Sequence, residues 1–244
     1  MVTTVSVLVA TRGREALLPG CLRSLLAQTL IEETEILVIH GPGGRDLEAA
    51  EPFLSSGRIR CVPSPRAGLY LAWNTGVGVA SGRYLTNLNS DDRLRADALE
   101  VMARALDAHP EVCLVYGDSL VTRRPDETFE KNSGGGRRLA WPEYTPEALL
   151  ERCICGPHPM WRREVHSRLG LFDESFASAG DYEMWLRIAE VAPMLHLPEP
   201  LGLYYDNPEG LSRPSRGTRR ERLSIVQRYL HRYRDVMRAR SPSE

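Results

Sequence analysis

The amino-acid sequence predicts an α/β fold with a mixed, mostly parallel central sheet flanked by helices. The main observation is that short, β-branched apolar runs alternate with helical apolar stripes over the first half of the chain. Such alternation is typical of parallel strands whose two faces are both covered by helices. With 244 residues, the chain is long enough for one substantial domain and short for two.

The first strand and the first helix are the clearest elements. Residues 4–10 are rich in valine and end at a polar, arginine-containing loop, as expected for a buried strand. Residues 15–27 carry leucines at helical spacing, and Pro19 fits in the first turn of that helix. Similar apolar runs bounded by Gly, Pro or polar residues predict strands at 35–39, 58–62, 83–88 and 112–116. Helices are predicted between them at 46–54, with Asp46 as its cap, and at 69–80 and 97–109.

The pattern becomes less regular after residue 118. Residues 119–130 are predicted as an extended or hairpin segment, and residues 131–138 contain three consecutive glycines, which favours a loop. Apolar stripes predict helices at 146–152, 181–191 and 219–237, and short strands are predicted at 194–197 and 201–205. We therefore expect a regular first half and a second half with longer connections.

Composition and charge narrow the classes of function. The formal net charge of -1 gives no overall attraction to nucleic acid, so we expect no nucleic-acid partner. The N-terminus lacks a basic leader with an apolar core, and the apolar runs are shorter than the ~20 residues that a membrane span needs. The five cysteines lack the spacing of zinc sites or redox motifs, which predicts reduced, partly buried thiols. These features predict a cytoplasmic protein.

An acidic corner follows the fourth predicted strand, in the segment Leu88-Asn89-Ser90-Asp91-Asp92. Open α/β sheets bind ligands at the carboxyl ends of their strands, where this corner would lie. Closely spaced carboxylates are costly there unless a cation neutralises them. A hard divalent cation shared with a phosphorylated ligand fits this chemistry. The corner is therefore the first candidate functional site.

Five segments, taken together, resemble the family 2 glycosyltransferases, which are inverting enzymes with the nucleotide-diphospho-sugar fold called GT-A. The segments are residues 5–12, 72–82, 88–92, 170–174 and 181–187. The resemblance implies one GT-A domain at 1–212, with a nucleotide-sugar-binding half (1–118) and an acceptor-binding half (119–212), before a basic C-terminal helix and tail (213–244). It also implies that a sugar moves from a nucleotide-diphospho-sugar donor to an acceptor hydroxyl, in polysaccharide, glycolipid or cell-surface glycan synthesis.

The resemblance assigns the acidic corner to the donor diphosphate and a divalent cation, Mn²⁺ or Mg²⁺. The family's Asp-x-Asp motif matches Asn89, Ser90 and Asp91, so that Asp91 takes the place of the metal ligand. Asn89 replaces a carboxylate but keeps a carbonyl acceptor, which could reach the metal through water. The lost charge predicts weaker cation binding, largely through the diphosphate. Asp92 could instead cap the next turn.

An inverting transfer needs one base that takes the proton of the attacking acceptor hydroxyl. The family places this base at the start of an amphipathic helix, and the matching residue is Asp181. The carboxylate that usually precedes the base is replaced by Gly180, a departure from the pattern. A helix cap is the alternative role for Asp181. Trp185, one turn further, could form part of a sugar platform or pack in the core.

The resemblance places the nucleotide across the first strands. Thr11 and Arg12 end the first strand, where the family contacts the base and ribose, and Arg14 is close enough in sequence to reach a phosphate. His40 ends the second strand, where the family usually carries Asp-Asp-Gly-Ser. A histidine cannot replace a carboxylate acceptor in its charged form, so UDP, GDP and dTDP donors all stay open.

Other candidates have more than one role open to them. Arg66 and Asn74 match a segment that lines the nucleotide in the family. Alternatively, Arg66 is an exposed cation in a loop, and Asn74 braces the loop. Asp118 follows the fifth strand, near the metal corner or the acceptor. His158, between two prolines, could line the acceptor groove or be structural.

The C-terminal region departs from the family pattern and is basic. Asn207 stands where the family often has a phosphate-contacting histidine, and Arg213 or the arginines of 134–138 could supply that contact. The helix at 219–237 could pack on its own domain with a solvated basic face. Alternatively, it contacts an anionic membrane surface at the inner face of the membrane, or a lipid-linked acceptor. A glycan acceptor and a homodimer are equally compatible with the sequence.

Two other functions stay open. A sugar nucleotidyltransferase shares related architecture, but it needs a glycine-rich basic phosphate loop after the first strand, and residues 11–14 are a poor version of one. A nucleotide-sugar-binding scaffold without catalysis is favoured by the departures from the family pattern. The presence of Asp91 and Asp181 favours an enzyme instead.

Overall fold

The computed structural model describes residues 3–43, 45–208, 210 and 215–240. In this part of the chain, the strands are β1 (Val5–Thr11), β2 (Thr34–His40), β3 (Ile59–Pro63), β4 (Tyr84–Asn87), β5 (Arg93–Leu94), β6 (Leu114–Thr122), β7 (Arg138–Leu139), β8 (Met160–Arg162) and β9 (Met194–Tyr205). The helices are α1 (Leu18–Leu26), α2 (Asp46–Ala50), α3 (Leu69–Val79), α4 (Ala98–Ala108), α5 (Pro146–Glu151), α6 (Val165–Leu169), α7 (Gly180–Ala189) and α8 (Arg216–Arg240), with 3₁₀ turns η1 (Ile31–Glu33) and η2 (Glu51–Ser56).

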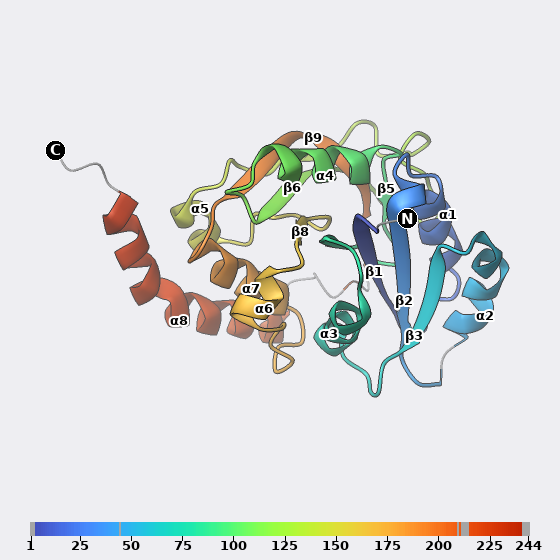
Figure 1. Ribbon diagram of the computed structural model, residues 1–244, viewed down its shortest axis with the longest axis horizontal. Helices are drawn as coiled ribbons and strands as arrows, with labels where there is room; N and C mark the ends of the chain where they lie inside the picture. The colour runs from blue at the N-terminus through green and yellow to red at the C-terminus, as the bar shows by residue number, and fades with distance from the viewer. Residues whose placement is uncertain (1–2, 44, 209, 211–214, 241–244) are drawn as a thin grey trace.

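The strands form one sheet in the order β3-β2-β1-β4-β8-β6-β9-β5, and β7 pairs with β6 outside this path. β1 is parallel to β2 and β4, β2 is parallel to β3, and β6 is parallel to β9. β8 is antiparallel to both of its neighbours, β4 and β6. The predicted mixed, mostly parallel sheet is confirmed, and Figure 1 shows it between helices.

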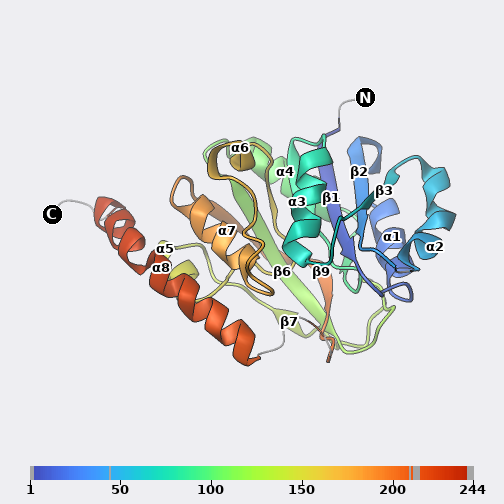
Figure 2. The same cartoon turned by 90° about the horizontal axis from the view of Figure 1, so that it is seen from below.

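Two apolar cores lie on the two faces of this sheet because side chains alternate along a strand. In β1, Val5, Val7 and Val9 pack with α1 and α4 on one face. Leu8 points the other way, into a core that includes residues of α3, α5, α7 and α8. Figure 2 shows α3 and α7 together on one side of the sheet. Both faces are therefore covered, as the β-branched strands predict.

The second half differs most from the sequence prediction. β6 is longer than predicted, and the two strands predicted at 194–205 are one strand, β9, with an irregular register beside Gly117 and Asp118. The short elements β5, β8 and α6 have no counterpart in the prediction. Runs of two to five residues are too short to show a periodic pattern, and tertiary pairing decides their conformation.

The C-terminal helix α8 packs on the rest of the domain. Ile225, Tyr229 and Tyr233 are fully or almost fully buried and belong to the core that also contains α7. The hydroxyl of Tyr233 donates a hydrogen bond to Leu186 O on α7 at 3.1 Å. Among the described helices, none is long and apolar enough to cross a membrane.

Candidate active site

The acidic corner lies where parallel strands end. β4 ends at Asn87, immediately before the corner, and Thr11 at the end of β1 lies beside His40 at the end of β2. Parallel strands bring their carboxyl ends to one edge of the sheet, so these segments share that edge. This is the edge at which the sequence predicts the donor nucleotide.

Asp92 is the structural carboxylate of the corner. It is 1% exposed, and Oδ1 accepts a hydrogen bond from Tyr205 N at 2.9 Å. Oδ2 accepts one from Asn89 Nδ2 at 3.1 Å and lies 3.3 Å from His158 Nε2, an electrostatic contact without hydrogen-bond alignment. Asp92 therefore fastens the corner to the end of β9, and the predicted role as a cap of the next turn is replaced by this bridge.

Asp91 is the carboxylate that stays half-buried and accessible. Its Oδ2 accepts a hydrogen bond from Asn207 Nδ2 at 3.0 Å. Burial and then the charge of Asp92 raise the pKa of Asp91, while Asn207 and the guanidinium of Arg14 act in the opposite direction. A carboxylate in this setting gains from a nearby cation.

A hollow of about 350 Å³ lies beside Asn207, the residue whose amide binds Asp91. Its lining residues are Arg14, Leu17, Pro125, Tyr205, Asn207 and Pro208. Asn207 connects the hollow to Asp91 through its side-chain amide. The hollow thus combines a guanidinium with an amide, two groups that suit phosphate oxygens.

Asp46 holds the loop that carries Arg14. Its Oδ1 accepts hydrogen bonds from Thr11 Oγ1 at 2.8 Å and from Arg14 N at 3.1 Å, and its Oδ2 accepts one from Gly13 N at 3.1 Å. The predicted capping role of Asp46 is wrong, since its carboxylate makes no cap hydrogen bond and α2 begins at Asp46 itself. The sequence offered no signal for this contact because more than 30 residues separate its partners.

The other residues predicted to contact the nucleotide sugar also lie near the carboxyl ends of the strands. Arg12 is exposed, and His40 is half-buried with Nδ1 at 3.4 Å from Gly41 O. Ser90 is 5% exposed, and its carbonyl accepts a hydrogen bond from the buried Arg93 at 3.4 Å. Asn89 donates to Asp92, whereas no donor among the described residues reaches its Oδ1. Among the described residues, the side-chain oxygen of Asn89 therefore keeps its capacity to accept a hydrogen bond or a cation.

Arg66 and Asn74 both join one loop. Arg66 is exposed and pairs with Glu174 at 2.7 Å. Asn74 is 7% exposed, and its side-chain amide bonds Phe172 O at 2.9 Å, Phe172 N at 2.9 Å and Glu174 Oε1 at 3.0 Å. Asn74 therefore braces the loop at 172–174, and Arg66 is an exposed cation paired with the same loop. Contact of either residue with a nucleotide stays a prediction.

Asp181 lies in the first turn of α7, half-buried. Its Oδ1 accepts hydrogen bonds from Tyr70 OH at 3.2 Å and from Tyr182 N at 2.8 Å. No other residue in the described part of the chain donates a hydrogen bond to Oδ2. Burial raises the pKa of Asp181, and the hydrogen bonds from Tyr182 N and Tyr70 and the more distant guanidinium of Arg222 partly offset that rise.

The contact with Tyr70 relates Asp181 to the donor edge. Tyr70 is in the first turn of α3, which begins shortly after the carboxyl end of β3. β3 is parallel to β2, and β2 to β1, so the start of α3 lies at the end of the sheet where the acidic corner also lies. The two candidate carboxylates are therefore at the same end of the domain.

Three weaker candidates have structural roles, and one is not described. Trp185 is 1% exposed and packs against Trp161 and Phe172, so the predicted sugar platform is wrong. His158 is 3% exposed beside Asp92, which corrects its assignment to the acceptor groove. Asp118 is 1% exposed and accepts hydrogen bonds from other parts of the sheet, so it is not free to bind a metal or an acceptor. Arg213 lies outside the described residues.

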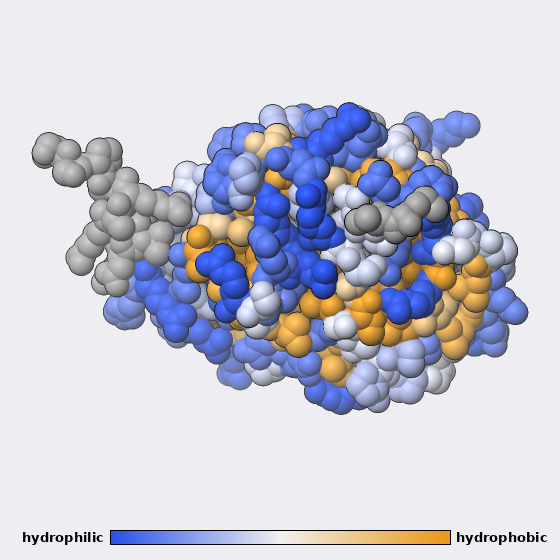
Figure 3. All heavy atoms as spheres, in the orientation of Figure 1, coloured by the Kyte–Doolittle hydropathy of each residue, from blue (hydrophilic) through white to orange (hydrophobic). Residues whose placement is uncertain are grey.

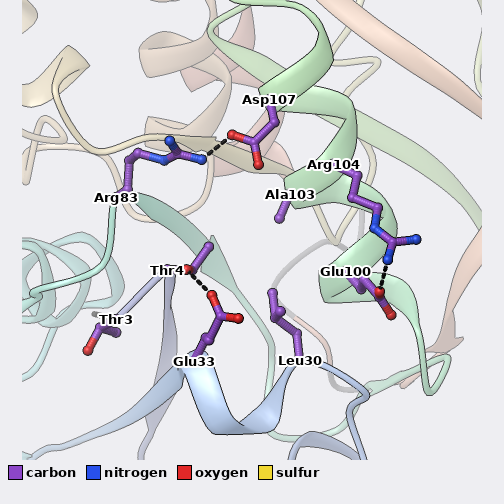
Figure 4. A pocket seen from close by; sticks show the side chains of 9 residues that line it. All are labelled: Thr3, Thr4, Leu30, Glu33, Arg83, Glu100, Ala103, Arg104 and Asp107. Carbon is purple, nitrogen blue, oxygen red and sulfur yellow. Dashed lines mark hydrogen bonds and ion pairs between the residues drawn. The ribbon is translucent and has the colours of Figure 1, made fainter. Parts of the chain in front are cut away.

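A larger hollow, of about 470 Å³, lies at the opposite edge of the sheet, beside the start of β1 and the residue before β4. Figure 4 shows its lining side chains, with Arg83 turned toward Asp107 and Arg104 toward Glu100. Glu33 accepts a hydrogen bond from Thr4. Because its charges are paired with one another, this hollow is a weaker candidate than the smaller one beside Asn207.

The residues of the corner suit a cation that arrives with its ligand. Within the described residues, no group of three or more His, Cys, Asp or Glu side chains could hold a metal ion alone. Asp91 offers a carboxylate whose charged form is disfavoured, and Asn89 offers a carbonyl oxygen. Hard divalent cations accept such oxygen ligands together with phosphate oxygens.

The chain is similar in sequence to known glycan-synthesising proteins. Chondroitin synthase of Escherichia coli is 29% identical over 178 residues, which make up 72% of this chain and 25% of that protein. A PGL/p-HBAD biosynthesis glycosyltransferase of Mycobacterium bovis is 28% identical over 185 residues, 75% of this chain and 68% of that protein. The chain thus spans about a quarter of the length of the chondroitin synthase.

Two solved structures share the fold. S. aureus TarS 1–349 in complex with UDP-GlcNAc has a TM-score of 0.73 at 17% identity, covering 91% of this chain and 65% of that one. Mannosyltransferase PcManGT from Pyrobaculum calidifontis, in complex with GDP-Man and Mn²⁺, has a TM-score of 0.65 at 17% identity, covering 93% and 69%. The predicted GT-A fold is confirmed by these likenesses. The family model described as glycosyl transferase family 2 matches residues 6–169, and the chain belongs to that family.

Proposed function

We propose that this chain is an inverting glycosyltransferase that moves a sugar from a nucleotide-diphospho-sugar to an acceptor hydroxyl, with Asp181 as the base. One observation carries the proposal. Two other residues donate to Oδ1 of Asp181, none of the other described residues donates to Oδ2, and burial raises the pKa of this carboxyl. A carboxylate with a raised pKa and a free oxygen suits a proton acceptor.

The chemistry follows from the two ends of the site. The acceptor hydroxyl gives its proton to Oδ2 of Asp181 while its oxygen attacks the anomeric carbon, and the bond to the diphosphate breaks on the opposite face. Arg14 and the amide of Asn207 line the hollow in which the leaving diphosphate would lie. Donors that meet the growing negative charge lower the barrier more than donors that bind only the ground state.

A divalent cation, Mn²⁺ or Mg²⁺, completes the donor site in this proposal. Asp91 would hold it, with the carbonyl of Asn89 directly or through water. When bound, the cation acts as a Lewis acid that stabilises charge on the diphosphate. The fit rests on the chemistry of these oxygens and on the raised pKa of Asp91.

The relatives support a class of donor and acceptor. Solved structures with the same fold are complexes with UDP-GlcNAc and with GDP-Man and Mn²⁺. We therefore expect a UDP or GDP sugar, with dTDP sugars as the remaining class. Similarity to a chondroitin synthase and to a PGL/p-HBAD biosynthesis glycosyltransferase supports a glycan or lipid-linked acceptor.

Donor binding is tested first, by the thermal shift that UDP-GlcNAc, GDP-Man and a dTDP sugar produce with and without Mn²⁺. Ligands that bind only the native state raise its stability by RT ln(1 + c/Kd) at a free ligand concentration c, so a tighter ligand gives a larger shift at the same concentration. At least one donor should raise the melting temperature, more strongly with Mn²⁺. If none does, the assignment of the donor site is wrong.

Catalysis is tested with Asp181→Asn and the donor identified in this way. This variant should keep the donor-induced shift and lose about 10²–10⁴-fold in turnover, the usual contribution of a general base. Asp107→Asn, at the opposite edge of the sheet, is the matched control and should keep wild-type turnover. Wild-type turnover of Asp181→Asn would show that the base is misassigned. Donor binding without donor hydrolysis or transfer by the wild type would favour the scaffold function.

Membrane contact is a separate part of the proposal and concerns α8. Its exposed residues include Arg216, Arg219, Arg220, Leu223 and Leu230, and the described part of the helix is mainly hydrophilic in Figure 3. Basic residues near an anionic surface contribute about 1 kcal/mol each. Flotation with phosphatidylserine vesicles should therefore capture the protein, and an Arg219→Glu/Arg220→Glu variant should bind less. Equal flotation of both would contradict the membrane role.

A further inference from the structure

The hydroxyl of Tyr70 is one of the two donors from other residues that hold Oδ1 of Asp181. The side chain of Tyr70 is 2% exposed, and its hydroxyl donates to Oδ1 of Asp181 at 3.2 Å. Burial and then the charge of Asp181 raise the pKa of Tyr70 well above its ordinary value. The phenol therefore stays protonated, and its O–H donates a hydrogen bond to the carboxylate.

The ring of Tyr70 is fixed by its neighbours. Trp73 meets it edge-on with 5.5 Å between ring centroids, and Phe172 stacks on it at 6.1 Å. Aromatic neighbours in these arrangements restrict a ring to one orientation. The hydroxyl is thus presented to Asp181 from a rigid wall of the core.

Gly180, the residue before Asp181, makes room for this ring. A Cβ atom at position 180 would lie 2.9 Å from two ring carbons of Tyr70, closer than real Cβ contacts allow. Gly180 is buried at the start of α7, where a glycine is otherwise unfavourable for a helix. The Tyr70 ring can therefore occupy its position only because residue 180 has no side chain.

We propose that Tyr70 is a positioning residue of the transfer reaction, whose hydroxyl fixes Oδ1 of Asp181 and leaves Oδ2 to receive the acceptor proton. Gly180 is the residue that permits this contact. The inference rests on the proposed function, since it takes Asp181 to be the proton acceptor. It goes further by naming what orients that acceptor and by predicting how its protonation depends on Tyr70.

The other groups around Asp181 do not replace this hydrogen bond. Arg222 on α8 acts on the carboxylate only through its charge. Cys153 and Cys155 lie close by, but burial raises the pKa of Cys153 to about 12 and that of Cys155 well above its ordinary value, so both thiols stay neutral. The backbone N–H of Tyr182 binds the same oxygen as Tyr70. Removal of the phenol hydroxyl should therefore weaken the charged form of Asp181 and raise its pKa.

The test compares Tyr70→Phe with Tyr233→Phe. The control also removes a hydroxyl from a buried tyrosine whose hydrogen bond is to the backbone of α7, away from Asp181. The first measurement is the titration midpoint of the Asp181 carboxyl in ¹³C-aspartate-labelled protein, assigned by its absence in Asp181→Asn. Tyr70→Phe should move this midpoint upward, and Tyr233→Phe should leave it unchanged. This measurement needs no donor.

The second measurement is the pH profile of kcat/KM for the donor that the thermal-shift screen identifies. On the acidic limb, Tyr70→Phe should lose about threefold to tenfold, because a hydrogen bond to the charged base is missing. Toward alkaline pH the difference should shrink. A loss of equal size at every pH would indicate a structural role only and would overturn the inference.

Gly180→Ala provides an independent variant. The new methyl group should displace the Tyr70 ring, raise the Asp181 midpoint and lower the urea midpoint, although alanine ordinarily stabilises a helix relative to glycine. In a Tyr70→Ala background the same substitution should no longer destabilise. Additive effects in this double-mutant cycle would contradict the packing arrangement.

The two failures can be told apart. If Asp181→Asn keeps wild-type turnover, the proposed base is wrong, whatever the titration shows. If Asp181→Asn loses turnover while Tyr70→Phe changes neither the titration midpoint nor the acidic limb, only the positioning role of Tyr70 is wrong.

Discussion

The acidic corner after β4 and the start of α7 each present a half-buried aspartate with a raised pKa, but they are built differently. At the corner, Asp91 lies beside the carboxylate of Asp92 and accepts a hydrogen bond from the side-chain amide of Asn207. Asn207 is more than 100 residues further along the chain. At α7, Asp181 lies among a buried phenol and neutral thiols. The first setting suits the binding of a cation together with a phosphate, whereas the second suits a carboxylate that accepts a proton.

Within the corner, the adjacent Asp91 and Asp92 differ as sharply. Asp92 is buried, and each of its two oxygens accepts a hydrogen bond, one from Tyr205 N and one from Asn89 Nδ2. His158 lies close to the second oxygen. Asp91 has one hydrogen bond from a side chain and remains half-buried. A carboxylate whose acceptors are all occupied supports the fold, and its neighbour with spare acceptor capacity is left for a ligand.

The largest expected effect on stability is that of Asp92→Ala. It should lower the free energy of unfolding by about 3 kcal/mol, because Tyr205 N and Asn89 Nδ2 lose their acceptor and the buried His158 loses the carboxylate beside it. Asp91→Ala should cost less than about 1 kcal/mol, since it also relieves the repulsion between neighbouring carboxylates. Urea unfolding of both variants measures the difference. Equal losses would remove the distinction between a structural and a functional aspartate.

Asp91→Asn sharpens the same comparison from the side of function. We expect turnover to fall about 100-fold, a loss typical of removing an electrostatic contact to the developing charge. The Mn²⁺-dependent part of the donor-induced thermal shift should also disappear. Asp126→Asn, an exposed carboxylate that pairs with Arg93, serves as a control for charge removal in the same region. Undiminished Mn²⁺ dependence in Asp91→Asn would exclude Asp91 as the cation ligand.

The smallest expected effect concerns Asp181 and pH. Burial raises the folded-state pKa of Asp181 above its unfolded value, so its contribution to stability is present in acid and is lost as pH rises through the folded pKa. Asp181→Asn has no such carboxyl to ionise and should therefore be more stable than the wild type at pH 8. The difference should vanish below about pH 3, where this carboxyl of the wild type is protonated in both the folded and the unfolded state. An unchanged difference at both pH values would contradict the raised pKa.

The sequence was sufficient for the regular half of the fold. Strands such as β1 and β2 carry enough β-branched residues to be recognised, and the helical stripe of α4 is equally clear. It was insufficient for β5 and β8, which are two and three residues long and form only because neighbouring strands pair with them. Their conformation is a tertiary effect.

The candidate site divides in the same way. The local motifs identified Asp91 and Asp181 as acidic residues at the ends of elements. The roles of Asp46, Tyr70 and Asn207 depend on contacts that join positions 35 or more residues apart, and nothing in the local pattern indicates them. Conversely, His158 and Trp185 have suitable chemistry but are enclosed in the fold, a fact that only burial reveals.

The central claim, that one carboxylate activates the acceptor for a single displacement, is tested most directly by the stereochemistry of the product. Proton NMR of the product formed from an α-linked UDP or GDP sugar gives the configuration at the anomeric carbon. The account predicts a β-linked product, because attack and departure occur on opposite faces. An α-linked product would contradict it, since retention requires a different arrangement of the reacting groups.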